Sequence, residues 1–108
     1  MPIQEMRSET LLGRTDERWF HTETVTDATS APLIVPSIGR AVAVAVTPGT
    51  SATVQYTLSS YADIEADTAA WHDWEEGQVS AAAGSSVIGA VSALRLVSAG
   101  ASTWEVAA

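Results

Sequence analysis

The two histidines are the side chains in this sequence best suited to acid–base chemistry. His72 stands beside Asp73, so a general base with an orienting carboxylate is conceivable there. His21 lies in a segment rich in aromatic and β-branched residues, which predicts a strand. No nucleophile motif of the Gly-x-Ser-x-Gly kind accompanies either histidine. We therefore expect His72 to bond locally or to line an interface, and we expect no catalytic residues.

A run of acidic residues in the middle of the chain raises the question of a cation site. Asp63, Glu65 and Asp67 alternate as at the start of a calcium loop, and hard cations bind several oxygen ligands. The sixth position of such a loop is Thr68 where glycine is required, and the twelfth is Trp74 where glutamate is required. We expect a solvated acidic connection with no metal or other cofactor, and keep a weak Ca²⁺ site as the alternative. A pair of glycosidase carboxylates is a further alternative, which the number of acids alone does not support.

Trp71 and Trp74 stand three residues apart in the same acidic connection. Flat aromatic rings stack on the apolar faces of sugars, so this pair could present a platform to a glycan. In the other interpretation the rings plug the open end of a small β-sandwich, which needs large side chains to complete its core. We favour the plug and keep receptor or glycan binding as the competing function.

The charge of the chain excludes some classes of partner. The formal net charge is −8, from thirteen acids, five arginines and no lysine. Nucleic acids and anionic membrane surfaces bind mainly through Lys and Arg, so neither is an expected partner. Only 17% of the residues are charged, and the chain has no cysteine. Its surface must be rich in small residues, which suit close packing of subunits but are equally compatible with compositional drift in an extracellular or virion protein. Its stability must come from packing or assembly.

Strand and turn signals follow one another from residue 19 onward. The clearest strand spans residues 40–46, where Ala and Val alternate with a period of two and both faces look buried. A Pro-Gly turn of type II is expected at 47–50. Further strands are expected at 19–26, 33–35 (an edge strand between two prolines), 52–58, 91–97 and 103–106, with a weak strand starting at Val79. A long connection is expected at 59–78 and a small-residue loop at 81–86. Seven or eight short strands predict an all-β fold, an antiparallel β-sandwich of jelly-roll or immunoglobulin-like kind.

Residues 1–18 differ in composition from the rest of the chain. They hold three of the five arginines and four acids, with scattered apolar residues. This composition predicts an extended N-terminal arm, which either frays or becomes ordered on a neighbouring subunit, followed by a β-sandwich domain at 19–108. The candidate subunit-contact residues are Arg7, Leu11, Leu12, Arg14 and Arg18 in the arm, with Trp71 and Trp74 in the long connection.

Residues 53–106 contain a strand, a tryptophan loop, a second strand and a closing hairpin in that order. The segments are Thr53-Val54-Gln55-Tyr56-Thr57-Leu58-Ser59-Ser60, Ala62-Asp63-Ile64, Trp71-His72-Asp73-Trp74 with Gly77, Val91-Ser92-Ala93-Leu94-Arg95-Leu96, and Gly100 with Trp104-Glu105-Val106. This half of the chain resembles small accessory structural proteins of tailed-bacteriophage virions, with head decoration or cement proteins as the nearest role.

The resemblance implies a virion structural protein that is not an enzyme. Many copies would bind and stabilise the phage head, on its outer surface, after synthesis in the host cytoplasm. The implied partners are the major capsid protein or other virion subunits, together with further copies of the chain in a homo-oligomer. A tail-associated role is the alternative within the same class.

Overall fold

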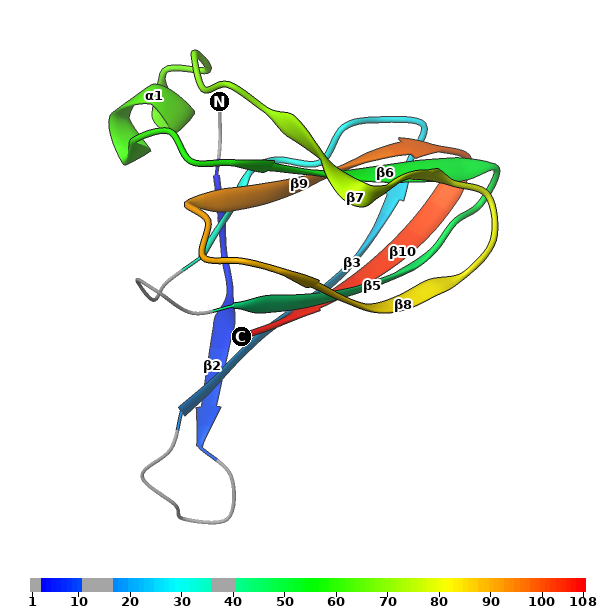
Figure 1. The fold of residues 1–108 in the computed structure, drawn as a ribbon, viewed down its shortest axis with the longest axis horizontal. Helices are drawn as coiled ribbons and strands as arrows, with labels where there is room; N and C mark the ends of the chain where they lie inside the picture. The colour runs from blue at the N-terminus through cyan, green and yellow to red at the C-terminus, as the bar shows by residue number, and fades with distance from the viewer. Residues whose placement is uncertain (1–2, 11–16, 36–40) are drawn as a thin grey trace.

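The computed structural model describes residues 3–10, 17–35 and 41–108, which form two β-sheets packed face to face (Figure 1). Among these residues the first sheet has the strand order β1-β4-β9-β6-β7 and the second has the order β2-β3-β10-β5-β8. The strands are β1 (Gln4–Glu5), β2 (Arg7–Thr10), β3 (Glu17–Thr26), β4 (Leu33–Ile34), β5 (Val42–Thr47), β6 (Ser51–Thr57), β7 (His72–Val79), β8 (Ala83–Ile88), β9 (Ala93–Ala99) and β10 (Ala101–Ala107). One short helix, α1 (Tyr61–Glu65), joins β6 to β7. The predicted all-β sandwich is confirmed.

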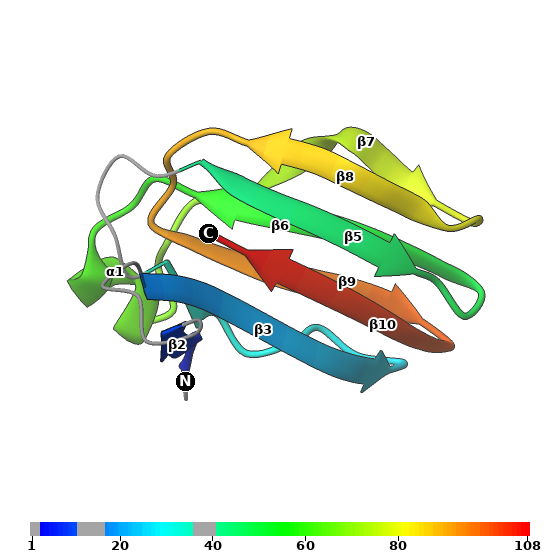
Figure 2. The ribbon, with the colours of Figure 1, turned by 90° about the horizontal axis from the view of Figure 1, so that it is seen from below.

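Strands β3 to β10 are connected as a jelly roll. β3 pairs with β10, β4 with β9, β5 with β8 and β6 with β7, and all four pairs are antiparallel. Four nested pairs arise when one long hairpin folds over on itself, which produces two Greek keys. Of the two kinds of sandwich that the sequence left open, this strand order selects the jelly roll. Figure 2 looks onto the second sheet, where β3, β10, β5 and β8 lie side by side.

Residues 4–10 join both sheets, whereas the sequence predicts that they belong to an arm. β1 pairs in parallel with β4, and the Gln4 amide donates to the Pro32 carbonyl at 2.7 Å. β2 pairs with β3, and the two strands project beyond the sandwich (Figure 1). Met6, between β1 and β2, is 5% exposed and packs in the core. Over these residues the expected boundary at residue 18 does not separate an arm from the domain.

The core lies between the two sheets. It consists mainly of aliphatic side chains, which come from both sheets, together with Trp74 and Trp104. Trp104 is fully buried and Trp74 is 3% exposed. The plug that we favoured from the sequence is therefore confirmed for Trp74.

β5 confirms the predicted alternation but not the predicted burial of both faces. Val42, Val44 and Val46 point into the core and are each at most 2% exposed. Ala43, in contrast, is exposed and Ala45 is half-buried. The alanine side is open because no described element packs against the outer side of the second sheet.

Two strands lie where the sequence predicts connections. β7 falls in the predicted long connection, and its alternation is broken because residues 74–77 lie opposite the single Val54 of β6. Within this bulge Gly77 has a φ of 63°, and the Trp74 indole N–H donates to the Gly77 carbonyl at 2.6 Å. β8 falls in the predicted small-residue loop, whose Ala, Gly and Ser content lowers its strand propensity. Its pairing with β5 is a long-range contact that local sequence signals do not reveal.

The turn between β5 and β6 differs from the expected type II turn. Gly49 does not have the positive φ which that turn requires at its position. A glycine is needed there for another reason, because an added Cβ would lie 2.5 Å from the Ala101 backbone nitrogen. The Gly49 amide also donates to Ser102 Oγ at 3.0 Å. This turn is therefore held directly against the start of β10.

Candidate functional site

The fold does not bring the predicted contact residues together. Arg7 is exposed in β2, and Arg18 lies in β3 opposite Glu9. Trp74 is buried, so the folded chain does not offer its ring to a partner. Three of the predicted contact residues lie outside the described residues: Leu11, Leu12 and Arg14.

Trp71 belongs to a polar cluster on the outer side of the first sheet. The Arg95 guanidinium lies 4.3 Å from the centroid of the Trp71 ring, which is a cation–π contact. Arg95 Nε donates to Gln55 Oε1 at 2.7 Å, and Gln55 Nε2 donates to Asp73 Oδ1 at 2.9 Å. Because Arg95 covers Trp71 and Trp74 is buried, the two indole rings do not form a common platform for a sugar.

His72 and Asp73 do not form a base with an orienting carboxylate. Neighbouring residues of a strand project to opposite faces. The His72 ring packs against Tyr56, with the ring centroids 5.6 Å apart, whereas Asp73 accepts its hydrogen bond from Gln55 on the other face. The one histidine with suggestive sequence neighbours therefore lacks the geometry that the chemistry requires.

The predicted cation ligands are also dispersed. Asp63 and Glu65 lie in α1, and Asp67 follows the helix with a φ of 61°. Burial lowers the pKa of Arg95, and the negative charge of Asp67 opposes that shift. The Asp67 carboxylate therefore interacts electrostatically with the Arg95 guanidinium. Within residues 3–10, 17–35 and 41–108, no group of three or more His, Asp and Glu side chains could hold a metal ion.

A polar cluster around Glu23 fastens the N-terminal segment to the second sheet. Glu23 Oε1 accepts hydrogen bonds from Gln4 Nε2 at 3.1 Å, His21 Nε2 at 3.1 Å and Trp104 Nε1 at 3.0 Å. Burial raises the pKa of Glu23, but the hydrogen bonds outweigh it and hold this pKa below its ordinary value of 4.5. The sequence analysis missed this cluster because Gln4 and Trp104 are far from Glu23 along the chain.

We expect the Glu23 cluster to make the fold sensitive to acid. Since the pKa of Glu23 is lower in the folded chain, its ionisation stabilises the fold above pH 4.5, and this contribution is lost as the pH falls through the folded pKa. At neutral pH the Glu23→Gln variant should be less stable than the wild type by about 1 kcal/mol. Urea unfolding at several pH values should show this difference shrinking below pH 4.5. A difference that stays constant with pH would contradict the role of the Glu23 charge.

The outer side of β3, β10 and β5 carries small side chains in a regular grid, which we call the outer face. The strand register aligns them in three rows across the sheet: Phe20–Ala107–Ala43, Thr22–Glu105–Ala45 and Thr24–Thr103–Thr47. Glu105 is the only charged residue among the nine. Thr24 and Thr103 share a hydrogen bond of 2.8 Å between their hydroxyls.

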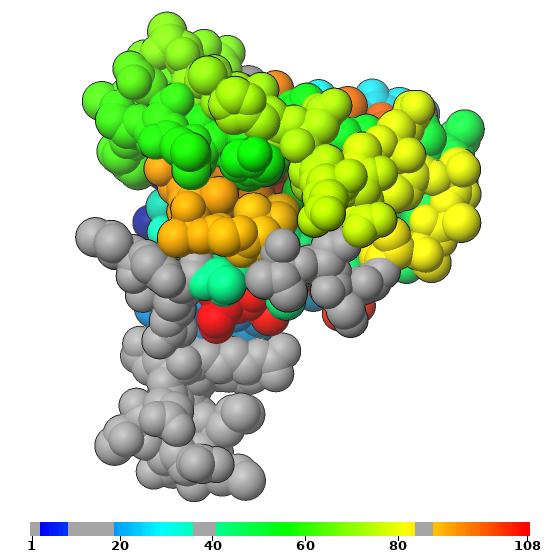
Figure 3. All heavy atoms as spheres, viewed as in Figure 1, coloured from blue at the N-terminus to red at the C-terminus, as the bar shows by residue number. Residues whose placement is uncertain are grey.

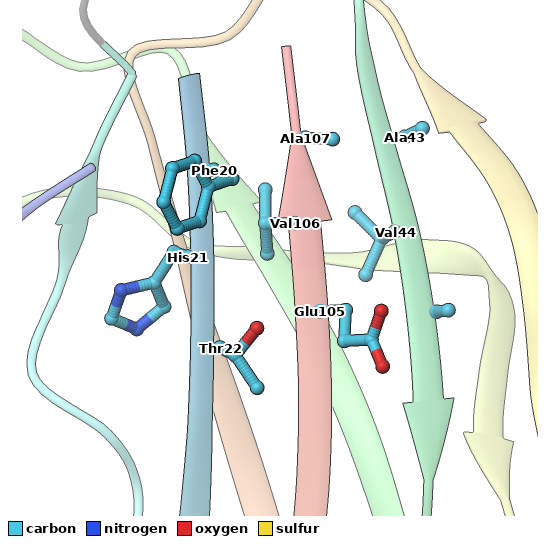
Figure 4. Close-up of a pocket in the computed structure, with 9 residues that line it drawn as sticks. Phe20, His21, Thr22, Ala43, Val44, Glu105, Val106 and Ala107 are labelled. Carbon is cyan, nitrogen blue, oxygen red and sulfur yellow. The ribbon is translucent and has the colours of Figure 1, made fainter. Parts of the chain in front are cut away.

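A shallow hollow of about 220 Å³ lies over the first two rows of this grid (Figure 4). Phe20 and Thr22 line it from β3, Glu105 and Ala107 from β10, and Ala43 from β5. The hollow exists because the alanine side chains leave the backbone close to the surface between the larger Phe20 and Glu105. From the sequence we predicted that both faces of this strand are buried, whereas its alanine side lies at the surface and helps to form the hollow.

A second hollow, of about 330 Å³, lies near the open edge between β7 and β8. Tyr56, Trp74 and Ile88 contribute to its apolar lining, and Leu58, which also lines it, is 66% exposed. Glu75 adds one carboxylate to the lining. This hollow has no cluster of polar groups of the kind that orients a small ligand.

The fold and its faces define this chain as a jelly-roll β-sandwich with one exposed sheet face of small side chains. No protein-family model, curated protein or solved structure matches it. Among the described residues, no helix has both the length and the apolar character needed to cross a membrane.

Proposed function

We propose that this chain is a structural protein of a virus particle, a decoration or cement subunit that binds the phage head and stabilises it through subunit contacts. The observation that supports this most is the outer face, a regular grid of small side chains that no other described part of the chain covers. Jelly-roll domains are frequent building blocks of viral capsids, which supports the proposal by analogy of fold. The resemblance of residues 53–106 to phage accessory proteins points in the same direction.

The outer face has the properties of a surface made for protein contact. Two sheets can pack face to face at a separation of about 10 Å when their side chains interdigitate. Ala and Thr lose little side-chain entropy on burial, unlike Lys, Glu or Gln, so covering this face has a low entropic cost. Burial of its methyl groups and of Phe20 then stabilises the contact.

Six of the thirteen acidic residues lie away from the outer face. They belong to α1, to β7 or to the connection between these two elements: Asp63, Glu65, Asp67, Asp73, Glu75 and Glu76. In Figure 3 these elements, green to yellow-green, form the upper part of the molecule, whereas the outer face belongs to the second sheet below. Because Glu105 is the one charged residue among the nine of the outer face, docking through this face meets less electrostatic repulsion than docking through α1 and β7.

The competing glycan-binding function has less support. It depends on Trp71 and Trp74, one covered by Arg95 and the other buried in the core. A tail-associated position remains an alternative within the same structural class, since the same face could serve there.

The proposal is tested with phage capsids assembled and expanded without this chain. Purified chain is added back, and the copies that sediment with the particles are counted. We expect saturable binding, and we expect Ala43→Arg, which places a long charged side chain on the outer face, to weaken it at least about tenfold. Ala99→Arg is the matched control, because Ala99 is an exposed alanine on the outer side of the first sheet. Failure of the wild type to bind, or equal losses in both variants, would refute the proposal.

A further inference from the structure

We infer that the partner seated on the outer face is a second copy of this chain, related to the first by a two-fold axis. This inference deepens the proposed function and rests on its assignment of the outer face as the contact surface. The inference is based on the charged side chains that lie on the outer face and at its rim.

Two charged side chains of opposite sign flank the middle of the face. Arg7 in β2 stands opposite Phe20 of β3, and Glu105 in β10 stands opposite Thr22 of the same strand. β3 therefore lies between the two charges. Both side chains are exposed, and neither makes a hydrogen bond or ion pair with another residue in the described ranges. Glu5 belongs to β1 of the first sheet, but it lines one hollow together with Arg7 and Phe20, so a second acidic residue lies at this rim.

This arrangement is complementary to itself. In a two-fold interface a contact between residue i of one copy and residue j of the other also occurs in the reverse sense. A pairing that brings Arg7 of one copy to Glu105 of the other thus forms the same ion pair twice and neutralises all four charges. A partner whose contact surface carried charge of one sign would place a like charge against either Arg7 or Glu105.

The net charge of the chain argues against pairing through its other surfaces. Two copies that met through α1 and β7 would bring their acidic residues together, and like charges in an interface oppose association. At the outer face and its rim, Arg7 offsets one of the two acidic residues Glu5 and Glu105, which leaves one net negative charge among the described side chains. Two copies of an acidic chain therefore meet there with less repulsion than through α1 and β7.

The size of the face sets the expected strength of the pair. The grid covers residues 20–24, 103–107 and 43–47 on three strands. With strands spaced by about 4.8 Å and a rise of about 3.4 Å per residue, it presents roughly 240 Å². Standard interfaces bury about 800 Å² per partner, so this pair should be weak, with a dissociation constant of roughly 10–100 μM. On a capsid, where many copies are held close together, such a contact gains strength from the high local concentration.

Charge reversal provides the test, with sedimentation equilibrium of the full chain as the measurement. Arg7→Glu alone and Glu105→Arg alone should each weaken self-association at least about tenfold, because each places two pairs of like charges in the interface. The double variant should associate as the wild type does. An equimolar mixture of the two single variants should form mixed pairs, because both contacts then join opposite charges. Thermal unfolding confirms that each exposed substitution leaves the fold intact.

The outcomes separate this inference from the proposed function. A wild-type chain that stays monomeric at about 500 μM, well above the expected dissociation constant, would overturn the inference. So would single variants that associate normally, or single variants that fail to pair with each other. If the chain is monomeric and Ala43→Arg still abolishes binding to capsids, the face contacts the shell and only the proposed function survives. If the charge-reversal pattern holds but no capsid is bound, the inference survives and the proposed function fails.

Discussion

Replacing Trp104 with alanine should lower the free energy of unfolding by about 4 kcal/mol. Trp104 is fully buried and is the largest of the fully buried side chains. Its removal leaves a cavity between the sheets and also removes two contacts, the hydrogen bond to Glu23 and the edge-on packing against His21 at 5.9 Å. Domains of this size are stable by only about 5–15 kcal/mol, so this loss is a large fraction of the total stability.

Urea unfolding measures this loss of stability. Two further variants test whether the loss comes from the buried position of the Trp104 ring. Trp104→Phe keeps most of the buried ring but not the indole N–H, so it should lose about 2 kcal/mol less than the alanine variant. Trp71→Ala removes a half-buried tryptophan that packs against Arg95 outside the core, and it should lose about 1 kcal/mol. Equal losses for Trp71→Ala and Trp104→Ala would show that the core does not lie where the structure has it.

Replacing Gly49 with alanine should lower the free energy of unfolding by about 3 kcal/mol. The new Cβ would lie 2.5 Å from the nitrogen and 2.6 Å from the oxygen of Ala101, and these are backbone atoms that cannot rotate away. The turn between β5 and β6 would have to move away from β10, which would also disturb the hydrogen bond from Gly49 to Ser102.

Two other glycines serve as controls for this prediction. Gly77 has a positive φ of 63° with open space around it, so Gly77→Ala should cost about 1 kcal/mol from backbone strain alone. Gly89 has open space and no positive φ, so Gly89→Ala should change stability by less than about 0.5 kcal/mol. Denaturant midpoints in the order Gly89→Ala, Gly77→Ala, Gly49→Ala, from highest to lowest, would agree with the structure. A Gly49→Ala variant as stable as Gly89→Ala would contradict the close approach of the turn to β10.

Strand β10 connects the stability of the fold with the proposed function. Trp104 and Val106 point into the core, while Thr103, Glu105 and Ala107 alternate with them on the outer face. Because side chains of a strand point alternately to its two sides, packing of the core fixes the positions of the outer residues. The outer face is therefore a rigid surface, and a partner that binds it does not have to order it first.

Several elements could be predicted from the sequence because their signals are local. The period-two alternation predicted β5 and the burial of its valines. The closing hairpin expected around Gly100 does not form, because β9 belongs to the first sheet and β10 to the second. His72 and Asp73, which stand side by side in the sequence, project to opposite faces of the sheet.

Other elements depend on partners distant in the chain. β7 loses its alternation at the bulge of residues 74–77, and β8 consists of small residues with little strand propensity of their own. β7 is held in place by hydrogen bonds to β6, and β8 by hydrogen bonds to β5. A local sequence pattern does not reveal either pairing. For the same reason the Glu23 cluster and the role of Met6 in the core could not be predicted.

The sequence by itself determined that this chain is an acidic, cysteine-free β domain whose alternating valines supply a core. Composition and strand period are properties of neighbouring residues, so no coordinates were needed for that conclusion. Only the tertiary structure decided that the strands nest as a jelly roll and that the alanines of β5 face outward beside Phe20 and Glu105. The physical reason is that alternation shows that a strand has two different sides, whereas the packing of the second sheet decides which of those sides is covered.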